Sequence, residues 1–209
     1  MMNYKAIIPC AGFGTRMNMT SNQSKEMIID PKTQSPLIDY TLGLCAVYRL
    51  NPLIITRSEK KDLIEYLKLK NIHFIINDDP GEWMDSVLSS QHHWLDNNIL
   101  LLPDTRFQPI SVVGAIKEKL NNNDLAFATH KVDDVRAWGS IKDGQLTEKS
   151  SVFEPGNAWG IIGFKKEVGL DLFFSMKERD KPIKLKNYEC VELKSFIDLT
   201  RTGKIEKYE

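Results

Sequence analysis

A short glycine-containing segment follows the first apolar run of the chain, and its residue types suit the binding of phosphate. The apolar residues 5–9 lead directly into residues 10–17, whose sequence is CAGFGTRM. Glycines at such a turn allow backbone N–H groups to approach an anion closely, and the hydroxyl and guanidinium at the end of the turn add further donors. The candidate ligand-binding residues of this loop are Ala11, Gly12, Gly14, Thr15 and Arg16.

Three interpretations of this loop stay open on spacing alone. A dinucleotide-binding fingerprint requires a small residue where the chain has Met17. A Walker loop requires Gly-Lys-Ser/Thr, and the chain offers Gly14-Thr15-Arg16. A tight turn with incidental glycines is the third interpretation.

Two aspartates follow apolar runs in distant parts of the chain. Asp104 comes after residues 99–102, and Asp198 follows Phe196 and Ile197. Ligands of open α/β sheets gather at the carboxyl ends of the strands, where both carboxylates are expected. Two carboxylates from separate strands suit Mg²⁺, which takes its other ligands from water and substrate phosphates. A lone aspartate more often caps a turn, so this alternative also stays open.

Composition indicates an ordinary globular protein. The chain has 209 residues, 42% hydrophobic and 27% charged, and we expect residues 1–209 to form a single domain. Lys plus Arg and Asp plus Glu both number 28, so no excess positive charge favours nucleic acid or an acidic membrane as a partner. No apolar run approaches the roughly 18 residues of a membrane span. The three scattered cysteines suit reduced thiols, and we expect a cytoplasmic location. A homo-oligomer is compatible with this composition.

Alternating short apolar runs and amphipathic stretches predict an α/β fold with a mainly parallel central sheet flanked by helices. The predicted strands are residues 5–9, 53–56, 73–76, 99–102 and 125–128. The predicted helices are residues 36–48, 59–69, 83–94 and 111–120. Beyond residue 129 the pattern changes, and residues 138–141 and 159–164 with a turn at 142–145 predict antiparallel elements that continue the same sheet.

Several segments resemble, in order, the sequence pattern of the sugar-phosphate nucleotidyltransferases. The matching segments are IIPCAGFGTRM (7–17), SKEM (24–27), SPLIDYTL (35–42), LLPDTRF (101–107), WGSIKDG (138–144), EKSSVFEPGNAWGIIGF (148–164) and SFIDLTRTG (195–203). The resemblance covers nearly the whole chain and implies a glycosyltransferase-A-like, Rossmann-like fold. The chain departs from the pattern in having Ser24 where a proline usually precedes the lysine, and residues 18–23 in place of a proline-rich segment.

The resemblance implies that a nucleoside monophosphate passes from an NTP to a phosphorylated small molecule, such as a sugar 1-phosphate, with release of pyrophosphate. Arg16 would hold the β and γ phosphates through its planar fork, and Lys25 would place a point charge near the α phosphate. Asp104 and Asp198 would hold Mg²⁺. Gly81 and Asp85 would lie against the nucleotide base. The residues implied on the acceptor side are Gly139, Glu148, Lys149 and Asn157.

Two other functions stay open at this point. A cytidylyltransferase acting on a polyol phosphate, an isoprenoid precursor or phosphocholine shares the glycine loop and the lysine. A non-catalytic nucleotide-binding regulator would keep the fold without the chemistry, although it has little need for both Asp104 and Asp198. The mixed-charge residues 177–181 are interpreted as solvated surface.

Substitution of Arg16 tests the phosphate-loop interpretation. If Arg16 holds the leaving pyrophosphate, Arg16→Ala lowers kcat and raises the KM for NTP, because negative charge accumulates there in the transition state. Arg16→Lys keeps the charge without the fork and recovers only part of the loss. Steady-state kinetics that stay within about twofold of wild type for Arg16→Ala would remove this assignment.

Overall fold

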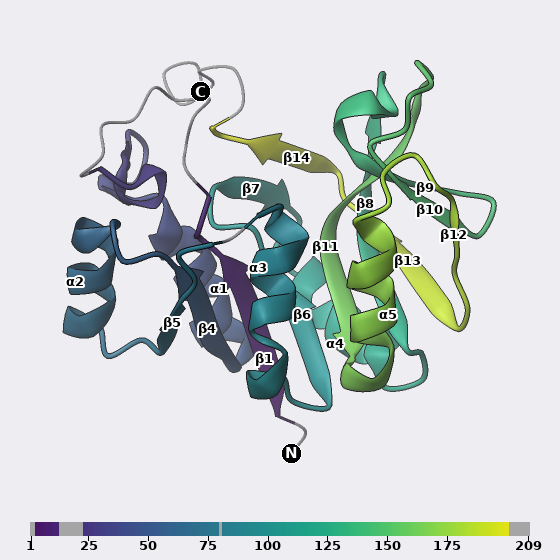
Figure 1. Cartoon of the computed structure of the whole chain (residues 1–209). Coiled ribbons are helices and arrows are strands. Elements are labelled where there is room, and N and C mark those ends of the chain that lie inside the picture. The colour runs from purple at the N-terminus through teal and green to yellow at the C-terminus, as the bar shows by residue number, and fades with distance from the viewer. Residues whose placement is uncertain (1–2, 13–22, 80, 201–209) are drawn as a thin grey trace.

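The computed structural model describes residues 3–12, 23–79 and 81–200, which are arranged as Figure 1 shows. Gly14, Thr15 and Arg16 lie outside the described residues, so the expectations for these three stay predictions. No helix in the described part of the chain is both long enough and apolar enough to cross a membrane.

The centre of the fold is a sheet in which most strands run parallel. In spatial order its strands are β5 (Phe74–Ile76), β4 (Leu50–Thr56), β1 (Tyr4–Pro9), β6 (Asn97–Leu100), β11 (Gly156–Lys165), β8 (Leu125–Val132) and β13 (Tyr188–Glu192). β1 pairs in parallel with β4 and β6, β4 with β5, and β8 with β13. β11 runs antiparallel to both β6 and β8. The mainly parallel sheet predicted from the sequence is confirmed.

The antiparallel elements of the C-terminal part extend this sheet. β11 continues past the end of β6 and pairs there with β9 (Gly139–Lys142) through Asn157 and Ala158. β9 and β10 (Gln145–Glu148) form a hairpin around the predicted turn, although β10 itself was not predicted, and β12 (Ile183–Lys184) joins its outer edge. The turn between β9 and β10 contains Asp143 and Gly144 in the left-handed region, at φ 48° and 76°.

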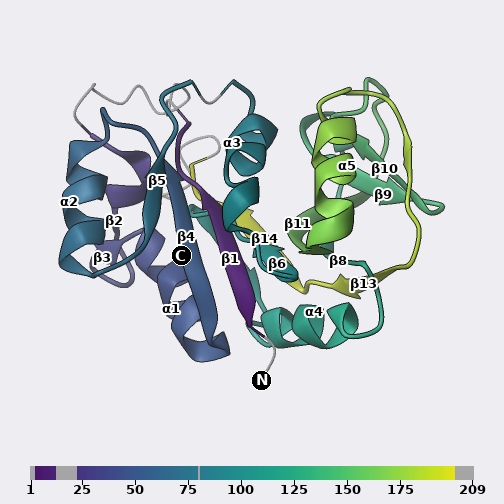
Figure 2. The same cartoon turned by 60° about the horizontal axis from the view of Figure 1, so that its bottom comes forward.

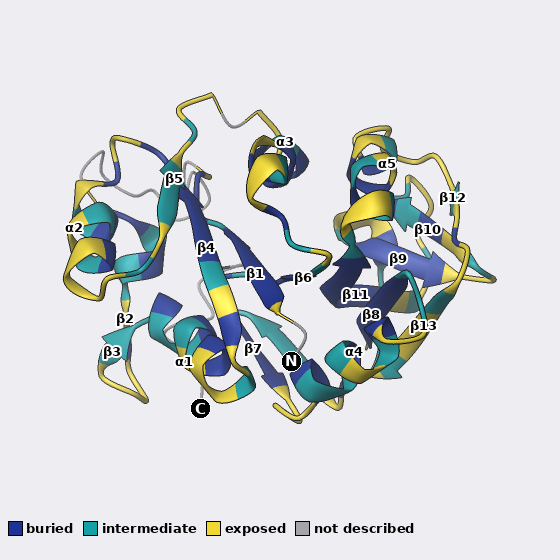
Figure 3. Ribbon diagram, turned by 90° about the horizontal axis from the view of Figure 1, so that it is seen from below, coloured by how far each residue is buried: buried dark blue, intermediate teal, exposed yellow. Residues whose placement is uncertain are grey.

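Helices cover both faces of the sheet (Figure 2). α1 (Ile38–Tyr48) and α4 (Val112–Leu120) cover one face, α3 (Trp83–Ser89) and α5 (Lys166–Met176) the other, and α2 (Lys61–Leu69) lies at the β5 end. The side chains of β1 explain this arrangement, because successive residues point to opposite faces. Ala6 and Ile8 pack in one apolar cluster with α1 and α4, and Ile7 packs in the other with α3 and α5. The helices accordingly bury one side and expose the other (Figure 3).

The sequence did not predict every helix boundary. The expected helix 83–94 divides at Ser90 into α3 and a 3-10 turn at Gln91–His93. The Ser90 hydroxyl donates to the Val87 carbonyl at 2.6 Å and accepts from the Trp94 indole at 2.9 Å, which draws the backbone out of the helix. α5 was not predicted, and its exposed Phe174 beside the buried Phe173 obscures the helical period.

Two small antiparallel ribbons complete the fold; the sequence indicated a strand that ends at Asp198, but neither pairing was predicted. β7 (Thr105–Gln108) pairs with β14 (Ser195–Asp198), and β2 (Ile29–Asp30) pairs with β3 (Ser35–Pro36). Arg106 of β7 joins the two ribbons: its guanidinium lies 2.8 Å from the Asp30 carboxylate and also donates to the Leu37 carbonyl at 3.3 Å. Both members of this ion pair are buried.

Removing one partner of this buried pair tests its role in the fold. Arg106→Met leaves the Asp30 carboxylate buried without its cation, and we expect the free energy of unfolding to fall by about 3–5 kcal/mol. Lys142→Met, which removes a cation from the exposed pair with Glu154 at 2.9 Å, is the matched control and should change stability little. Urea unfolding measures both variants, and equal small effects would contradict the assignment.

Candidate active site

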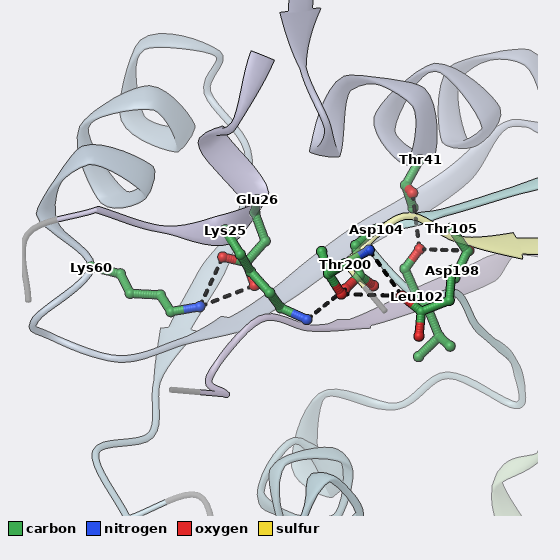
Figure 4. Close-up of polar contacts among 9 residues, drawn as sticks. All are labelled: Lys25, Glu26, Thr41, Lys60, Leu102, Asp104, Thr105, Asp198 and Thr200. Carbon is green, nitrogen blue, oxygen red and sulfur yellow. Dashed lines mark hydrogen bonds and ion pairs between the residues drawn. The ribbon is translucent and has the colours of Figure 1, made fainter. Parts of the chain in front are cut away.

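Asp104 lies at the carboxyl edge of the central sheet, where the sequence predicted it (Figure 4). β6 ends at Leu100, and the chain turns before β7 begins at Thr105. The turn is held at the Leu102 carbonyl, which accepts hydrogen bonds from the hydroxyls of Thr41 at 3.1 Å and Thr105 at 3.3 Å. Asp104 is only 6% exposed, so its charge must be compensated locally.

Asp198 reaches the same place from a different part of the fold. It ends β14, where it pairs with Thr105, and therefore belongs to the small ribbon and not to a strand of the central sheet as the sequence pattern suggested. The Thr200 hydroxyl lies between the two carboxylates, 2.6 Å from Asp104 Oδ2 and 3.1 Å from Asp198 Oδ1. The two predicted metal ligands are thus brought together.

The two carboxyl groups differ in how readily they ionise. Burial disfavours the charged form of Asp104, but the nearby ammonium of Lys25 and hydrogen bonds from Lys25 and Thr200 hold the pKa of this carboxyl below its usual value. Burial and the negative charge of Asp104 together raise the pKa of Asp198. A further cation at this pair would relieve the repulsion between the carboxylates.

Lys25 supplies the positive charge of the site. It begins a short 3-10 helix, η2 (Lys25–Met27), and its Nζ lies 2.6 Å from Asp104 Oδ2. Although burial opposes a charged amine, the carboxylates of Asp104 and Glu26 raise its pKa above the usual value. The raised pKa favours the charged form of Lys25.

A first pocket opens beside Lys25, and two of the residues predicted to bind nucleotide, Gly12 and Gly81, line it. Its lining includes Gly12, Lys25, Gly81, Ser86 and Asp104. Gly81 adopts φ +50°, a conformation that glycine tolerates best. Ala11, which was also predicted to bind nucleotide, is fully buried in the core and does not line this pocket. We call this cavity the donor pocket.

Asp85 was predicted at the nucleotide base, and the structure gives it other contacts. One carboxylate oxygen accepts the Glu82 backbone N–H at 2.9 Å, which caps the start of α3. The other oxygen pairs with the Lys177 ammonium at 2.6 Å. Asp85 therefore shapes the turn beside the donor pocket, and a direct contact with a base stays a prediction.

A second pocket, which we call the acceptor pocket, brings together Gly139, Glu148 and Lys149 with Asp198. Glu148 is buried and accepts the Trp159 indole N–H at 3.3 Å, and burial raises the pKa of this carboxyl. Lys149 adopts φ +51° and donates its backbone N–H to Trp138 at 2.9 Å. Asn157, the fourth predicted acceptor residue, is exposed and lines a different depression with Ser140 and Glu154.

The two pockets share a wall. Trp83 and Leu102 line both of them, while Asp104 lines the donor pocket and Asp198 the acceptor pocket. Because the Thr200 hydroxyl touches both carboxylates, the aspartate pair lies where the two pockets meet.

Comparison with solved structures identifies the fold. A Bacillus anthracis protein described as a glucose-1-phosphate thymidylyltransferase, solved with sucrose, matches with a TM-score of 0.77 at 16% identity, over 98% of this chain and 93% of its own. UDP-glucose pyrophosphorylase from Acinetobacter baumannii matches at 0.74 and 15%, over 99% and 92%. HddC from Yersinia pseudotuberculosis matches at 0.71 and 17%, over 100% of both chains. The chain has the fold of the sugar-phosphate nucleotidyltransferases. Neither a protein-family model nor a curated protein matches the sequence.

Within this nucleotidyltransferase fold, the structure adds a connection that the sequence did not predict. The residues after α5 are exposed, as expected, and two of them also form ion pairs with the start of α3: Lys177 with Asp85, and Arg179 with Glu82. Asp180 then donates its backbone N–H to the Glu148 carbonyl at 3.0 Å. This segment joins the edge of the donor pocket to the acceptor pocket, and its mixed charges gave no sign of the partners.

Gly139→Ala tests the geometry of the acceptor pocket. A Cβ at residue 139 would lie 1.9 Å from Trp159 Nε1 and 2.2 Å from Glu148 Oε2, so both side chains must move. We expect the acceptor KM to rise about ten- to a hundredfold, the value of a hydrogen bond to a buried charged group, with little change in the KM for NTP.

The matched control is Gly43→Ala in α1, where an added Cβ meets nothing within 4 Å. This exchange should leave both KM values unchanged and stabilise the helix slightly. Steady-state kinetics of the two variants, with thermal unfolding in parallel, test whether Gly139 shapes the acceptor pocket. An unchanged acceptor KM in Gly139→Ala would contradict the assignment of this pocket.

Proposed function

We propose that this protein transfers a nucleoside monophosphate from an NTP to a phosphorylated small molecule, with a sugar 1-phosphate as the leading acceptor. The observation that carries the proposal is the wall that the two pockets share. Asp104 lines one pocket and Asp198 the other, and the Thr200 hydroxyl contacts both carboxylates. Such an arrangement suits a reaction between two phosphorylated ligands at their point of contact. Solved structures of this fold support it, because two of those named above are a thymidylyltransferase and a pyrophosphorylase by name, and HddC has also been solved with GMP-PN.

In the proposed reaction a phosphate oxygen of the acceptor attacks the α-phosphorus of the NTP. The new P–O bond forms as the bond to the bridging oxygen of the β phosphate breaks, and pyrophosphate leaves with its electron pair. No side chain needs to carry a proton, so the protein contributes mainly by positioning and by neutralising charge. Among the described residues that line the donor pocket, Lys25 is the cation. Arg16 is proposed to assist Lys25.

The aspartate pair fits the requirements of Mg²⁺. Within residues 3–12, 23–79 and 81–200, no three His, Cys, Asp or Glu side chains come together as a metal cage. Mg²⁺ does not need such a cage, because one or two carboxylates suffice when substrate phosphates and water complete its shell. We propose that Asp104 and Asp198 hold Mg²⁺, which would neutralise charge on the reacting phosphates.

The acceptor pocket suits a ligand with hydroxyl groups. The buried Glu148 carboxylate accepts hydrogen bonds, and Trp83 and Trp159, with ring centroids 5.3 Å apart, offer apolar surface. Lys149 is proposed to contact the acceptor phosphate. These features support a sugar 1-phosphate.

A second candidate is a cytidylyltransferase that acts on phosphocholine. Three tryptophans, Trp83, Trp138 and Trp159, line the acceptor pocket around the Glu148 carboxylate. Aromatic faces beside a buried negative charge attract a quaternary ammonium group. One pyrophosphate-release assay separates the candidates, with four NTPs crossed against sugar 1-phosphates and alcohol phosphates including phosphocholine. No release with any combination would contradict both candidates and favour a nucleotide-binding regulator.

Asn substitutions at the aspartate pair test the proposed metal site. Asp104→Asn and Asp198→Asn keep side-chain volume but weaken metal binding, so each should remove most Mg²⁺-dependent turnover while the protein stays folded by circular dichroism. Asp143→Asn, at an exposed turn position with φ 48° that asparagine tolerates, is the control and should behave as wild type. Wild-type turnover in both site variants would remove the metal assignment.

A further inference from the structure

The residues on either side of Lys25 are polar and buried, which is unusual for residues that do not face a pocket. Ser24 is 1% exposed and Glu26 is 0% exposed. Neither lines the donor or the acceptor pocket. Burying polar groups is unfavourable unless they find partners, so these two residues must be held by specific contacts.

Ser24 is held by Asp62, in the first turn of α2. Its hydroxyl donates to Asp62 Oδ1 at 2.5 Å and its backbone N–H donates to Asp62 Oδ2 at 2.9 Å. Asp62 Oδ1 also accepts the backbone N–H of Leu63 at 2.8 Å, so the carboxylate itself is fixed to the helix. Both hydrogen-bond donors of Ser24 therefore bind the same carboxylate, which is itself held by the helix.

Glu26 is held by Lys60, the residue that precedes α2. The Lys60 ammonium lies 2.8 Å from one carboxylate oxygen of Glu26 and 3.0 Å from the other. Lys60 is itself only 8% exposed, so this ion pair is buried on both sides. Buried ion pairs contribute little net stability but hold a definite geometry, because removing one partner strands the other charge.

The two contacts fix Lys25 from both sides. Ser24 and Glu26 are its chain neighbours, and Asp62 and Lys60 lie within one turn at the start of α2 (Figure 4 shows the Glu26–Lys60 pair beside Lys25). The backbone of Lys25 is thereby fixed, and its Nζ lies 2.6 Å from Asp104 Oδ2. We propose that Ser24, Glu26, Lys60 and Asp62 form a clamp that positions Lys25 for its role at the donor pocket.

The clamp residues are positioning residues, since they act through Lys25. The backbone N–H of Ser24 donates to Asp62 and is part of the clamp. A proline at this position has no N–H, so the contact with Asp62 depends on a residue other than proline here. Proline would instead restrict φ directly, and Ser24 already has φ −88°. The kinetic consequence of the clamp rests on the proposed nucleotidyl transfer, whereas its structural consequence does not.

The kinetic test uses Asp62→Asn and Ser24→Ala, with Glu65→Gln at an exposed position of α2 as the control. An amide at residue 62 turns an N–H₂ group toward one donor of Ser24, which displaces Lys25. We expect kcat to fall by about tenfold or more, given that a misplacement of about 1 Å can reduce turnover about a hundredfold. The acceptor KM should stay within about twofold, and Glu65→Gln should match wild type.

Combination with Lys25→Ala separates positioning from general damage. If the clamp acts through Lys25, Asp62→Asn lowers kcat in the wild-type background but adds nothing in the Lys25→Ala background. An equal fall in both backgrounds, or no fall in either, overturns the proposal. Thermal unfolding of each variant accompanies the kinetics. Glu26→Gln strands Lys60 and can reduce the yield of folded protein, so the milder Asp62 and Ser24 variants carry the test.

A crystal structure provides a readout that needs no activity. In Asp62→Asn we expect the Lys25 ammonium to leave Asp104, and in Glu65→Gln we expect it to stay. A wild-type protein without turnover in any assay would contradict the proposed function and leave the clamp to this structural test. An unmoved Lys25 in both Asp62→Asn and Ser24→Ala would overturn the clamp whatever the activity.

Discussion

A negative charge buried at the edge of the sheet is the constraint on which the site depends. Asp104 cannot remain ionised at 6% exposure unless positive charge and hydrogen-bond donors surround it. Lys25 provides the charge and Thr200 the additional donor, and they come from segments on opposite sides of Asp104 in the sequence. Compensation of this one carboxylate therefore draws the segment before the β2–β3 ribbon and the end of β14 to the same point.

The surrounding fold places this charge between two pockets. Pro9 at the end of β1 and Leu102 after β6 line the donor pocket. β11 contributes Trp159 to the acceptor pocket, and the β9–β10 hairpin adds Gly139 and Glu148. Arg106 holds the two ribbons against each other, so the backbone that follows Lys25 and the backbone that follows Asp104 are joined by a buried ion pair. Rigid elements thus support each side of the predicted reaction centre.

Much of the fold and part of the site could be predicted from the sequence, for physical reasons that differ between residues. The doubly buried strand β1 and the placement of Asp104 after β6 follow from continuous apolar runs. The convergence of Gly139, Glu148 and Lys149 agrees with the expectation drawn from resemblance. The clamp, the Thr200 contact and the Lys177–Asp85 pair could not be predicted, because each joins residues far apart in the chain and has no period or motif. Asp85 is a different case, because an aspartate in the first turn of a helix is favoured by the helix dipole, and the structure shows its carboxylate capping α3.

The indole of Trp83 lines both pockets and packs against Trp159 with a centroid separation of 5.3 Å. If ligands occupy both pockets, a shift of this ring imposed from one side alters the surface offered to the other, so the two binding energies are coupled. The coupling is reciprocal, and each ligand changes the affinity for the other by the same factor.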